Sequence, residues 1–244
     1  MPTPEADLIE IRDCPSSSLF VKAGLYALSS VQESSPFHQW DCCKPSCAWP
    51  GKTNLKTRPS LACDKFDRPL NDSNAWSACG KHGVAYMCSH EQPWAVNDQL
   101  SYGFAAVKLA GMSEDGWCCS CYELTFTEGP VKGKKFVVQA TNTGGDLGEN
   151  HFDMAIPGCG VGYLNGCTAQ HHAPKDGWGK RYGGISAVSE CSQLPQELQP
   201  GCHWRWSWYL GAQIPKVTFK RVKCPKEITE KSQCIRADED SFVE

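Results

Sequence analysis

Cysteine is the feature that most limits how this chain can fold: 16 of its 244 residues are cysteines, spread from Cys14 to Cys234. In a reducing compartment so many thiols would be expected to bind zinc, and zinc sites usually show two short C-x-x-C clusters or Cys/His pairs at fixed spacing. Here adjacent cysteines occur at Cys42–Cys43 and in the run CCSC at Cys118–Cys121. Adjacent cysteines do not readily ligate one tetrahedral ion, but they can form bonds in opposite directions from one strand. The pattern favours a disulfide framework in an oxidising compartment over zinc binding.

The composition is that of a globular protein without a strongly charged surface. Hydrophobic residues make up 41% and charged residues 21% of the chain, the net charge is -3, and neither sign forms a long run. We therefore expect neither nucleic-acid binding by a basic face nor a membrane span. The first residues, MPTPEADLIEIRDC, lack the basic start and apolar core of a signal peptide, whereas the sequon at Asn71 fits a secreted surface loop. The expectation is a secreted, extracellular protein with no recognisable signal peptide in this chain.

The chain divides into one large domain with a short segment at each end. Residues 1–36 form a separate N-terminal segment that ends in the polar run SSVQESSP, and we expect it to be poorly ordered. Residues 37–236 carry cysteines throughout, without an internal linker or repeat, so we expect one domain. Residues 237–244, ADEDSFVE, form an acidic tail.

Strand patterns dominate within the domain. Alternating, β-branched or aromatic runs predict strands at four places: Cys121–Thr127, Lys134–Asn142, His203–Leu210 and Pro215–Cys224. Helical patterns are short and cover Asp98 to Ala110 and a turn or two around Glu190 to Leu198. With 22 glycines and 16 prolines, these runs indicate a closed or crossed β-barrel with long loops. On the strand over His203–Leu210, alternate tryptophans would share one face and fill the barrel core; they are Trp204, Trp206 and Trp208.

Two stretches place carboxylates in unusual surroundings. In QWDCCKPSCAWPG, Asp41 lies beside two cysteines that would fix its backbone if bridged, as a base that holds a water molecule requires. In ATNTGGDLGENHFDMAIPGCGVG, Asp153 lies between Phe152 and Met154, an apolar setting that would keep it protonated as a proton donor. Two such carboxylates are the minimal equipment for glycoside hydrolysis. The alternative is that they are turn or cap residues of a binding protein.

Four stretches resemble the family 45 glycoside hydrolases. They are WDCCKPSCAW, AWSACGKHGVAYMCSHEQPWAVNDQLSYGFAAVKLAG, GWCCSCYELTFTEGPVKGKKFVVQATNTGGDLGENHFDMAIPG and NGCTAQ…GWGKRYGGISAVSEC. The resemblance runs from about Trp40 to Cys234 and leaves residues 1–36 uncovered. It implies a mainly β fold, a six-stranded double-psi β-barrel with long disulfide-linked loops and a few short helices. The implied activity is inverting endo-β-1,4-glucanase activity on cellulose and related β-glucans.

The resemblance also assigns roles to individual residues. Asp41 matches the general base, Asp153 the general acid, and Asp146 a third acid on a mobile loop that assists the reaction. Side chains with supporting or substrate-binding roles are His151 beside the acid, Trp49 as a sugar-stacking residue, Tyr182 near the cleft, and Trp40 and Lys44 next to the base. No metal or other cofactor is implied, and the pair His171-His172 is expected at the surface.

The resemblance pairs fourteen of the cysteines. The implied bridges are Cys42–Cys167, Cys43–Cys79, Cys47–Cys118, Cys63–Cys88, Cys119–Cys234, Cys121–Cys224 and Cys191–Cys202. Cys14 and Cys159 are left over, so they are either bridged to each other or both free thiols. Alkylation of the unreduced protein followed by intact mass distinguishes the two states.

The chain departs from the family pattern at three places. Gln39 stands where the family often has a tyrosine, Cys159 replaces a glycine, and GAQIP at Gly211–Pro215 replaces a polar run at the cleft edge. Two other functions also stay open. One is a non-hydrolytic, expansin-like wall-loosening protein, which would keep the acid and lack the base. The other is a barwin-like or lectin-like polysaccharide-binding module. The leading expectation is a monomeric enzyme whose partner is a β-1,4-glucan.

Overall fold

The computed structural model describes residues 8–12, 40–145, 147–213 and 215–242. Its strands are β1 (Leu8–Arg12), β2 (Trp94–Ala95), β3 (Leu100–Lys108), β4 (Cys121–Phe126), β5 (Lys135–Asn142), β6 (His151–Met154) and β7 (Lys216–Val222). Its α-helices are α1 (Glu114–Trp117), α2 (Cys167–His171), α3 (Gln199–Ser207) and α4 (Lys226–Ser232). Short 3-10 helices are η1 (Ser46–Ala48), η2 (Ser89–Glu91), η3 (Val188–Gln193), η4 (Gln196–Leu198) and η5 (Glu239–Ser241). The fold is mainly β with short helices, as expected.

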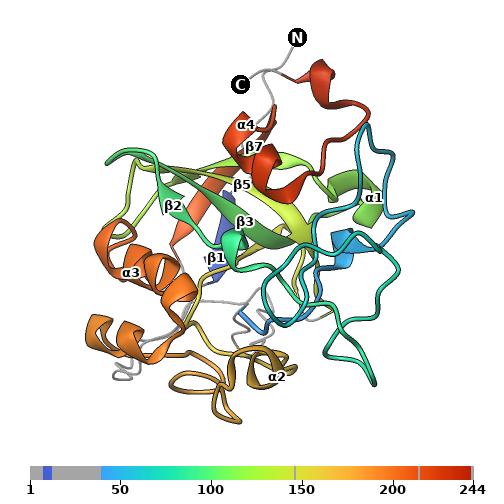
Figure 1. Cartoon of the computed structure of the whole chain (residues 1–244). Coiled ribbons are helices and arrows are strands. Elements are labelled where there is room, and N and C mark those ends of the chain that lie inside the picture. Colours follow the sequence, from blue (N-terminus) through green and yellow to red (C-terminus); the bar gives the residue numbers. More distant parts are fainter. Residues whose placement is uncertain (1–7, 13–39, 146, 214, 243–244) are drawn as a thin grey trace, which may run out of the picture.

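Six of the strands close into a ring. Strands β3, β5, β4, β7, β1 and β6 are neighbours in that order, and β6 returns to pair with β3. β6 pairs with the second half of β3, and β2 pairs with the first half on the same side, which extends the sheet there. In Figure 1 the ring lies at the centre, with α3 and α2 on its lower side and the long loops that precede β2 on the right. The double-psi crossing of the connections stays a prediction.

One strand of the ring comes from the N-terminal segment. β1 pairs antiparallel with β7 and parallel with β6, and Arg12 is in register with Asp153. Residues 8–12 therefore complete the ring between β7 and β6, although the family resemblance does not cover them. The division of the chain at residues 1–36, 37–236 and 237–244 stays a prediction.

The barrel core is built from alternate residues of its strands. On β4, Tyr122, Leu124 and Phe126 point inward and are buried, whereas Glu123 and Thr125 between them are only partly buried. Phe152 of β6 packs against Tyr122 with ring centroids 5.3 Å apart. This period of two is the pattern that predicted the strand from the sequence. The strands predicted over Cys121–Thr127, Lys134–Asn142 and Pro215–Cys224 are thus confirmed as β4, β5 and β7.

The strand predicted over His203–Leu210 is wrong, because these residues belong mainly to α3. Residues four apart share a face in a helix as well as in a strand, so the spacing of Trp204 and Trp208 fits both. The two indoles are stacked, with centroids 5.3 Å apart, and both pack on the barrel core. Each indole N–H is satisfied: that of Trp204 donates to Ser101 Oγ and that of Trp208 to the Asn97 carbonyl. Tertiary packing here overrides the strand preference of aromatic residues.

The helix predicted over Asp98–Ala110 is also wrong. Leu100–Lys108 is strand β3, which pairs with β5 on one side and with β2 and β6 on the other. Its centre is buried on both faces, so no alternation of polar and apolar residues marks it as a strand. The short helical turns expected around Glu190 to Leu198 are confirmed as η3 and η4.

Among the described residues, seven disulfides link loops and short helices to one another and to the barrel, and all seven implied pairs are confirmed. They are Cys42–Cys167, Cys43–Cys79, Cys47–Cys118, Cys63–Cys88, Cys119–Cys234, Cys121–Cys224 and Cys191–Cys202. Cys159 is buried and also disulfide-bonded. The partner proposed for it, Cys14, lies outside the described residues, so that pairing stays a prediction.

A buried carboxyl group lies under a β-bulge at the end of β5. The pairing of β3 with β5 steps from Ala105 opposite Ala140 to Ala106 opposite Asn142, which leaves Thr141 as the extra residue. The Thr141 hydroxyl donates to Glu91 Oε2 at 3.0 Å, and Glu91 is only 1% exposed. Burial raises the pKa of Glu91 from 4.5 to about 8. The group is therefore protonated in the folded protein at neutral pH.

We predict that Glu91→Gln removes part of the pH dependence of folding stability. The folded state keeps a proton on Glu91 that the unfolded chain releases above a pH of 4.5. The free energy of unfolding should therefore fall as the pH rises from about 5 to about 8, by an amount of order a few kcal/mol. The amide cannot ionise, so the free energy of unfolding of Glu91→Gln should depend less on pH over this range.

Denaturant unfolding at several pH values in that range checks the prediction. The exposed Glu227 serves as a control, because Glu227→Gln should keep the wild-type slope. A Glu91→Gln variant whose stability changes with pH as much as that of the wild type would contradict it.

Candidate active site

Asp41 lies in a loop without regular secondary structure, five residues before η1. Its Oδ1 accepts a hydrogen bond from the Cys43 N–H at 2.8 Å, so the carboxylate fixes the backbone two residues ahead. Cys42 between them has φ 61°, in the left-handed region. The local fold thus uses the aspartate as a turn residue, the structural role weighed from the sequence, and holds its carboxylate in a defined position at the same time.

The start of α2 holds this turn from the other side. The Gly166 N–H donates to the Asp41 carbonyl at 2.7 Å, and the next residue, Cys167, is bridged to Cys42. A Cβ atom at Gly166 would lie 3.0 Å from the Cys42 carbonyl oxygen and 3.2 Å from that of Asp41. A glycine is therefore needed for this close approach. The backbone on both sides of the Asp41 carboxylate is fixed by a covalent bond and hydrogen bonds.

Asp153 lies on β6, inside the wall of the barrel. It is 1% exposed and pairs in register with Ala106 of β3 and Arg12 of β1. Because side chains alternate along a strand, Asp153 and His151 share one face of β6, while Phe152 on the other face fills the core. His151 is buried, and its Nδ1 accepts a hydrogen bond from the Gly148 N–H at 3.0 Å. The histidine thereby orders the loop before the strand.

Two contacts bring the Asp41 loop to the part of the barrel that carries Asp153. Ala106 of β3 is in register with Asp153 on one side and Asn142 on the other. The Asn142 Oδ1 accepts a hydrogen bond from the Ser46 N–H at 2.9 Å, which fixes the residues that follow Asp41. The Trp40 N–H donates to the Gly160 carbonyl at 3.4 Å, in the loop that follows β6. Both proposed catalytic aspartates therefore lie on segments that meet around the end of β5.

Trp49 and Lys44 form a contact with each other. The Lys44 ammonium lies 3.5 Å from the centroid of the Trp49 ring and donates to the carbonyls of Ser73 and Ala75 at 2.7 and 2.9 Å. Burial lowers the pKa of Lys44 to about 8, so the group is still a cation at neutral pH. The contacts of Lys44 are those of a residue that positions Trp49; substrate binding by Lys44 stays a prediction.

The remaining predicted substrate contacts differ in exposure. Tyr182 is 44% exposed, and its backbone bridges that of Gly160, next to the Trp40 contact. Trp40 itself is buried, so its indole packs in the interior. Asp146 lies outside the described residues, and its role stays a prediction. The expectation of a surface pair holds for His172, which is exposed, and is wrong for His171, whose side chain is 7% exposed and whose Nδ1 lies 3.4 Å from Glu197 Oε1.

Sequence reasoning missed two residues near this site. Glu91 lies in the run CSHEQPW and Trp76 in the run NAWSACG, and neither run has a charge or spacing pattern that points to the site. Glu91 reaches Thr141, the neighbour of Asn142, and Trp76 contacts Trp49 with ring centroids 5.9 Å apart. Only the folded chain shows these contacts, because each joins residues far apart in the sequence.

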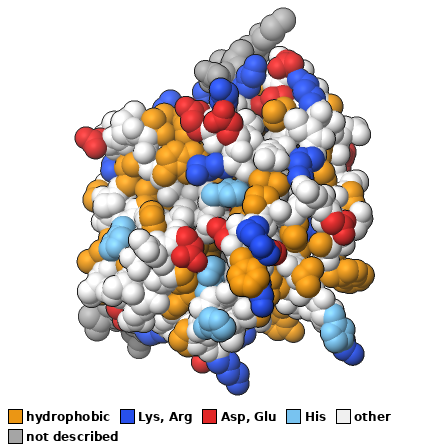
Figure 2. Space-filling model, viewed as in Figure 1, with side chains coloured by type: hydrophobic (Ala, Val, Ile, Leu, Met, Phe, Trp, Pro, Cys, Tyr) orange, Lys and Arg blue, Asp and Glu red, His pale blue; other side chains and the backbone are white. Residues whose placement is uncertain are grey.

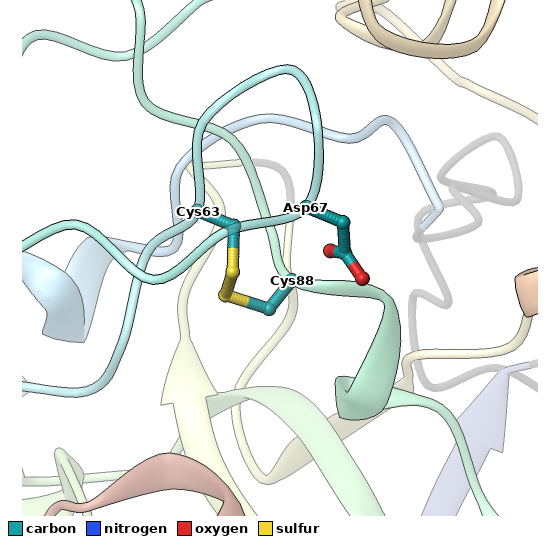
Figure 3. Close-up of side chains that lie close together, drawn as sticks. All are labelled: Cys63, Asp67 and Cys88. Carbon is teal, nitrogen blue, oxygen red and sulfur yellow. A yellow bond between two sulfur atoms is a disulfide. The ribbon is translucent and has the colours of Figure 1, made fainter.

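The described residues contain one group with the spacing of metal ligands, and it is not a metal site. Cys63, Asp67 and Cys88 lie close together, but Figure 3 shows the two sulfur atoms joined in a disulfide. A disulfide sulfur is not a thiolate and does not serve as a metal ligand. The Asp67 carboxylate instead accepts a hydrogen bond from the Ser89 N–H at 2.8 Å. Cys63 and Cys88 thus close a loop by their disulfide, and Asp67, within that loop, accepts a backbone hydrogen bond.

The face drawn in Figure 2 carries side chains of mixed type. Lysine and arginine side chains there are interspersed with acidic and hydrophobic ones. In the described part of the chain, every helix is too short or too polar to cross a bilayer.

Comparison with known proteins identifies the family. The model of glycosyl hydrolase family 45 matches residues 34–235. A putative endoglucanase type K of Fusarium oxysporum is 52% identical over 228 residues, which are 93% of this chain and 60% of that protein. This chain thus spans less than two thirds of the fungal relative. An endoglucanase of Cryptopygus antarcticus is 50% identical over 197 residues, 81% of this chain and 86% of that protein.

A solved structure agrees with the sequence comparisons. The crystal structure of a cellulase from the Antarctic springtail Cryptopygus antarcticus matches with a TM-score of 0.78 and 48% identity, over 82% of this chain and 95% of that chain. This chain belongs to glycosyl hydrolase family 45.

Proposed function

We propose that the protein is an inverting endo-β-1,4-glucanase that cuts internal bonds of cellulose and related β-glucans. The observation that supports this most is the pairing of a buried carboxyl, Asp153, with a carboxylate on a loop held by disulfides, Asp41, in a member of family 45. Relatives of this chain are named endoglucanase and cellulase. Both proposed carboxyl groups are present, which argues against the expansin-like alternative.

Asp153 is the proposed general acid. Asp153 has 1% of its residue surface exposed and lies on β6, so the surrounding chain holds its carboxyl group in a defined place, as a positioned acid requires. In the reaction, its proton passes to the glycosidic oxygen as the bond from that oxygen to the anomeric carbon breaks. His151 shares its face of β6 and orders the preceding loop, and Asp146 assists from that loop.

Asp41 is the proposed general base. Its carboxylate accepts a proton from a water molecule while the water oxygen attacks the anomeric carbon from the side opposite the leaving oxygen. The fixed backbone around Asp41 lowers the entropic cost of holding that water in line. Trp49, eight residues further along the same loop, offers a ring for a glucosyl unit. Tyr182, whose backbone bridges that of Gly160, offers a second ring.

The disulfide framework also bears on where the protein acts. Seven bridges among the described residues persist in an oxidising environment and would be reduced in the cytosol. A polymeric glucan is also too large to enter a cell. We therefore infer a secreted, extracellular protein; that it is a monomer and needs no cofactor stays a prediction.

We predict that Asp153→Asn and Asp41→Asn each remove most of the turnover and leave the fold intact. Each amide is nearly isosteric with the acid, and acid or base assistance supplies about 10²–10⁴-fold in rate. Asp146→Asn should have a smaller effect because its role is auxiliary. Reducing-sugar release from carboxymethylcellulose, with circular dichroism of each variant, measures both quantities.

The exposed Asp98, in the turn between β2 and β3, gives a matched control, because Asp98→Asn makes the same chemical change away from the site. It should keep wild-type rates. Viscosity recorded in parallel should fall early, with few new reducing ends, if cleavage is internal. Wild-type rates in Asp153→Asn or Asp41→Asn would overturn the mechanism.

We predict that the first product is the α-anomer. An inverting enzyme holds its two carboxyl groups about 6.5–9.5 Å apart so that a water molecule fits opposite the leaving oxygen, whereas a retaining enzyme holds them about 5–5.5 Å apart. Proton NMR during early hydrolysis of a soluble cello-oligosaccharide distinguishes the anomers before they interconvert. A β-anomer as the first product would show a retaining mechanism.

A further inference from the structure

An exposed tryptophan lies next to the proposed sugar-binding ring. Trp76 is 70% exposed, although it is large and apolar, and its ring centroid lies 5.9 Å from that of Trp49. Exposed apolar side chains that adjoin a functional site mark contact surfaces for ligands. We propose that Trp76 is an outer sugar-stacking position that binds a glucosyl unit of the substrate beyond Trp49. The inference rests on the proposed β-glucanase function and extends its binding site.

Trp76 is held in place from both sides along the chain. Cys79 is bridged to Cys43 in the Asp41 loop, and the Ser77 hydroxyl accepts the Lys44 N–H at 3.3 Å. The Trp76 carbonyl accepts hydrogen bonds from the N–H groups of Val84 and Ala85, both at 2.9 Å. A side chain on such a fixed backbone loses little freedom when it binds a ligand, and this favours affinity.

Lys44 links Trp76 to Trp49 and to the base. Its ammonium contacts the Trp49 ring and holds the carbonyls of Ser73 and Ala75, which precede Trp76. Lys44 is itself three residues after Asp41. One cation therefore sets the position of both tryptophans relative to the proposed catalytic carboxylate.

The orientation of the two rings indicates the kind of glucan. Their planes are 83° apart, an edge-to-face arrangement. A β-glucosyl ring presents axial C–H groups on its flat faces and stacks on an indole through them. Two perpendicular rings cannot both lie against a flat crystalline surface. A single chain can contact both where it twists about its glycosidic bonds, which a chain outside a crystal is free to do. The substrate that uses Trp76 is therefore a soluble or amorphous β-1,4-glucan chain.

Binding to an inactive enzyme tests the proposal without interference from turnover. In an Asp153→Asn background, calorimetry measures the dissociation constants of cellotetraose, cellohexaose and phosphoric-acid-swollen cellulose. Trp76→Ala should weaken binding of the longest chain that reaches it by about 3- to 10-fold, the size of one aromatic contact. Trp76→Tyr should restore most of the affinity because it keeps a stacking face.

A matched control uses another exposed aromatic residue. Phe66 is 64% exposed, and cations from Lys65 and Arg68 lie over its ring, so Phe66→Ala makes a comparable change on a separate turn. It should leave glucan binding unchanged. Circular dichroism confirms that each variant is folded, which the exposure of both side chains leads us to expect.

The outcomes separate this inference from the proposed function. The outer position would be supported if Trp76→Ala binds glucan more weakly than its parent and Trp76→Tyr recovers the affinity. Phe66→Ala should then bind glucan as tightly as the parent. Equal dissociation constants in Trp76→Ala and its parent, for every glucan that the parent binds, would overturn it while leaving the proposed function in place. A parent that binds no β-1,4-glucan would overturn both.

Discussion

The loop around Asp41 depends on covalent bonds because it has almost no regular secondary structure of its own. Between Asp41 and Trp49 the only regular element in the described chain is η1, of three residues. Three disulfides connect this stretch to the start of α2, to the segment after Trp76 and to the end of α1. Each closes a loop of the unfolded chain, which lowers the entropy of the unfolded state. The bridges replace the ladder hydrogen bonds that hold a strand in place.

The other proposed catalytic group is held by a different means. Asp153 lies within the barrel wall, where β3 and β1 pair with β6 on both sides. The barrel supplies the burial that a general acid needs, and the disulfide-linked loop supplies a carboxylate at its margin. Asn142 connects the two arrangements, because it pairs with β3 and also binds the backbone of Ser46. Beneath it, protonated Glu91 supports the bulge through Thr141, at a cost in stability that grows as the pH rises.

Sequence patterns predicted the elements in which the order of polar and apolar residues matches the burial of those residues in the fold. Tyr122, Leu124 and Phe126 alternate because β4 has one face in the core, and the strand was predicted correctly. β3 was mistaken for a helix because both of its faces are buried, and α3 was mistaken for a strand because Trp204 and Trp208 are four residues apart. The disulfide pairs followed from the family resemblance alone. The contacts of Trp76 and Glu91 could not be predicted from the sequence, because the residues next to each of them along the chain do not indicate its partner.

Removal of one bridge at a time tests most directly whether the covalent hold on the Asp41 loop makes the site work. Cys42→Ser with Cys167→Ser frees the turn at Asp41, whereas Cys191→Ser with Cys202→Ser opens a bridge between η3 and α3. The measurement is kcat on a soluble β-glucan at a temperature where circular dichroism shows both variants folded. We expect the first variant to lose most of its kcat and the second to keep it. Wild-type kcat in a folded Cys42→Ser, Cys167→Ser variant would contradict the account.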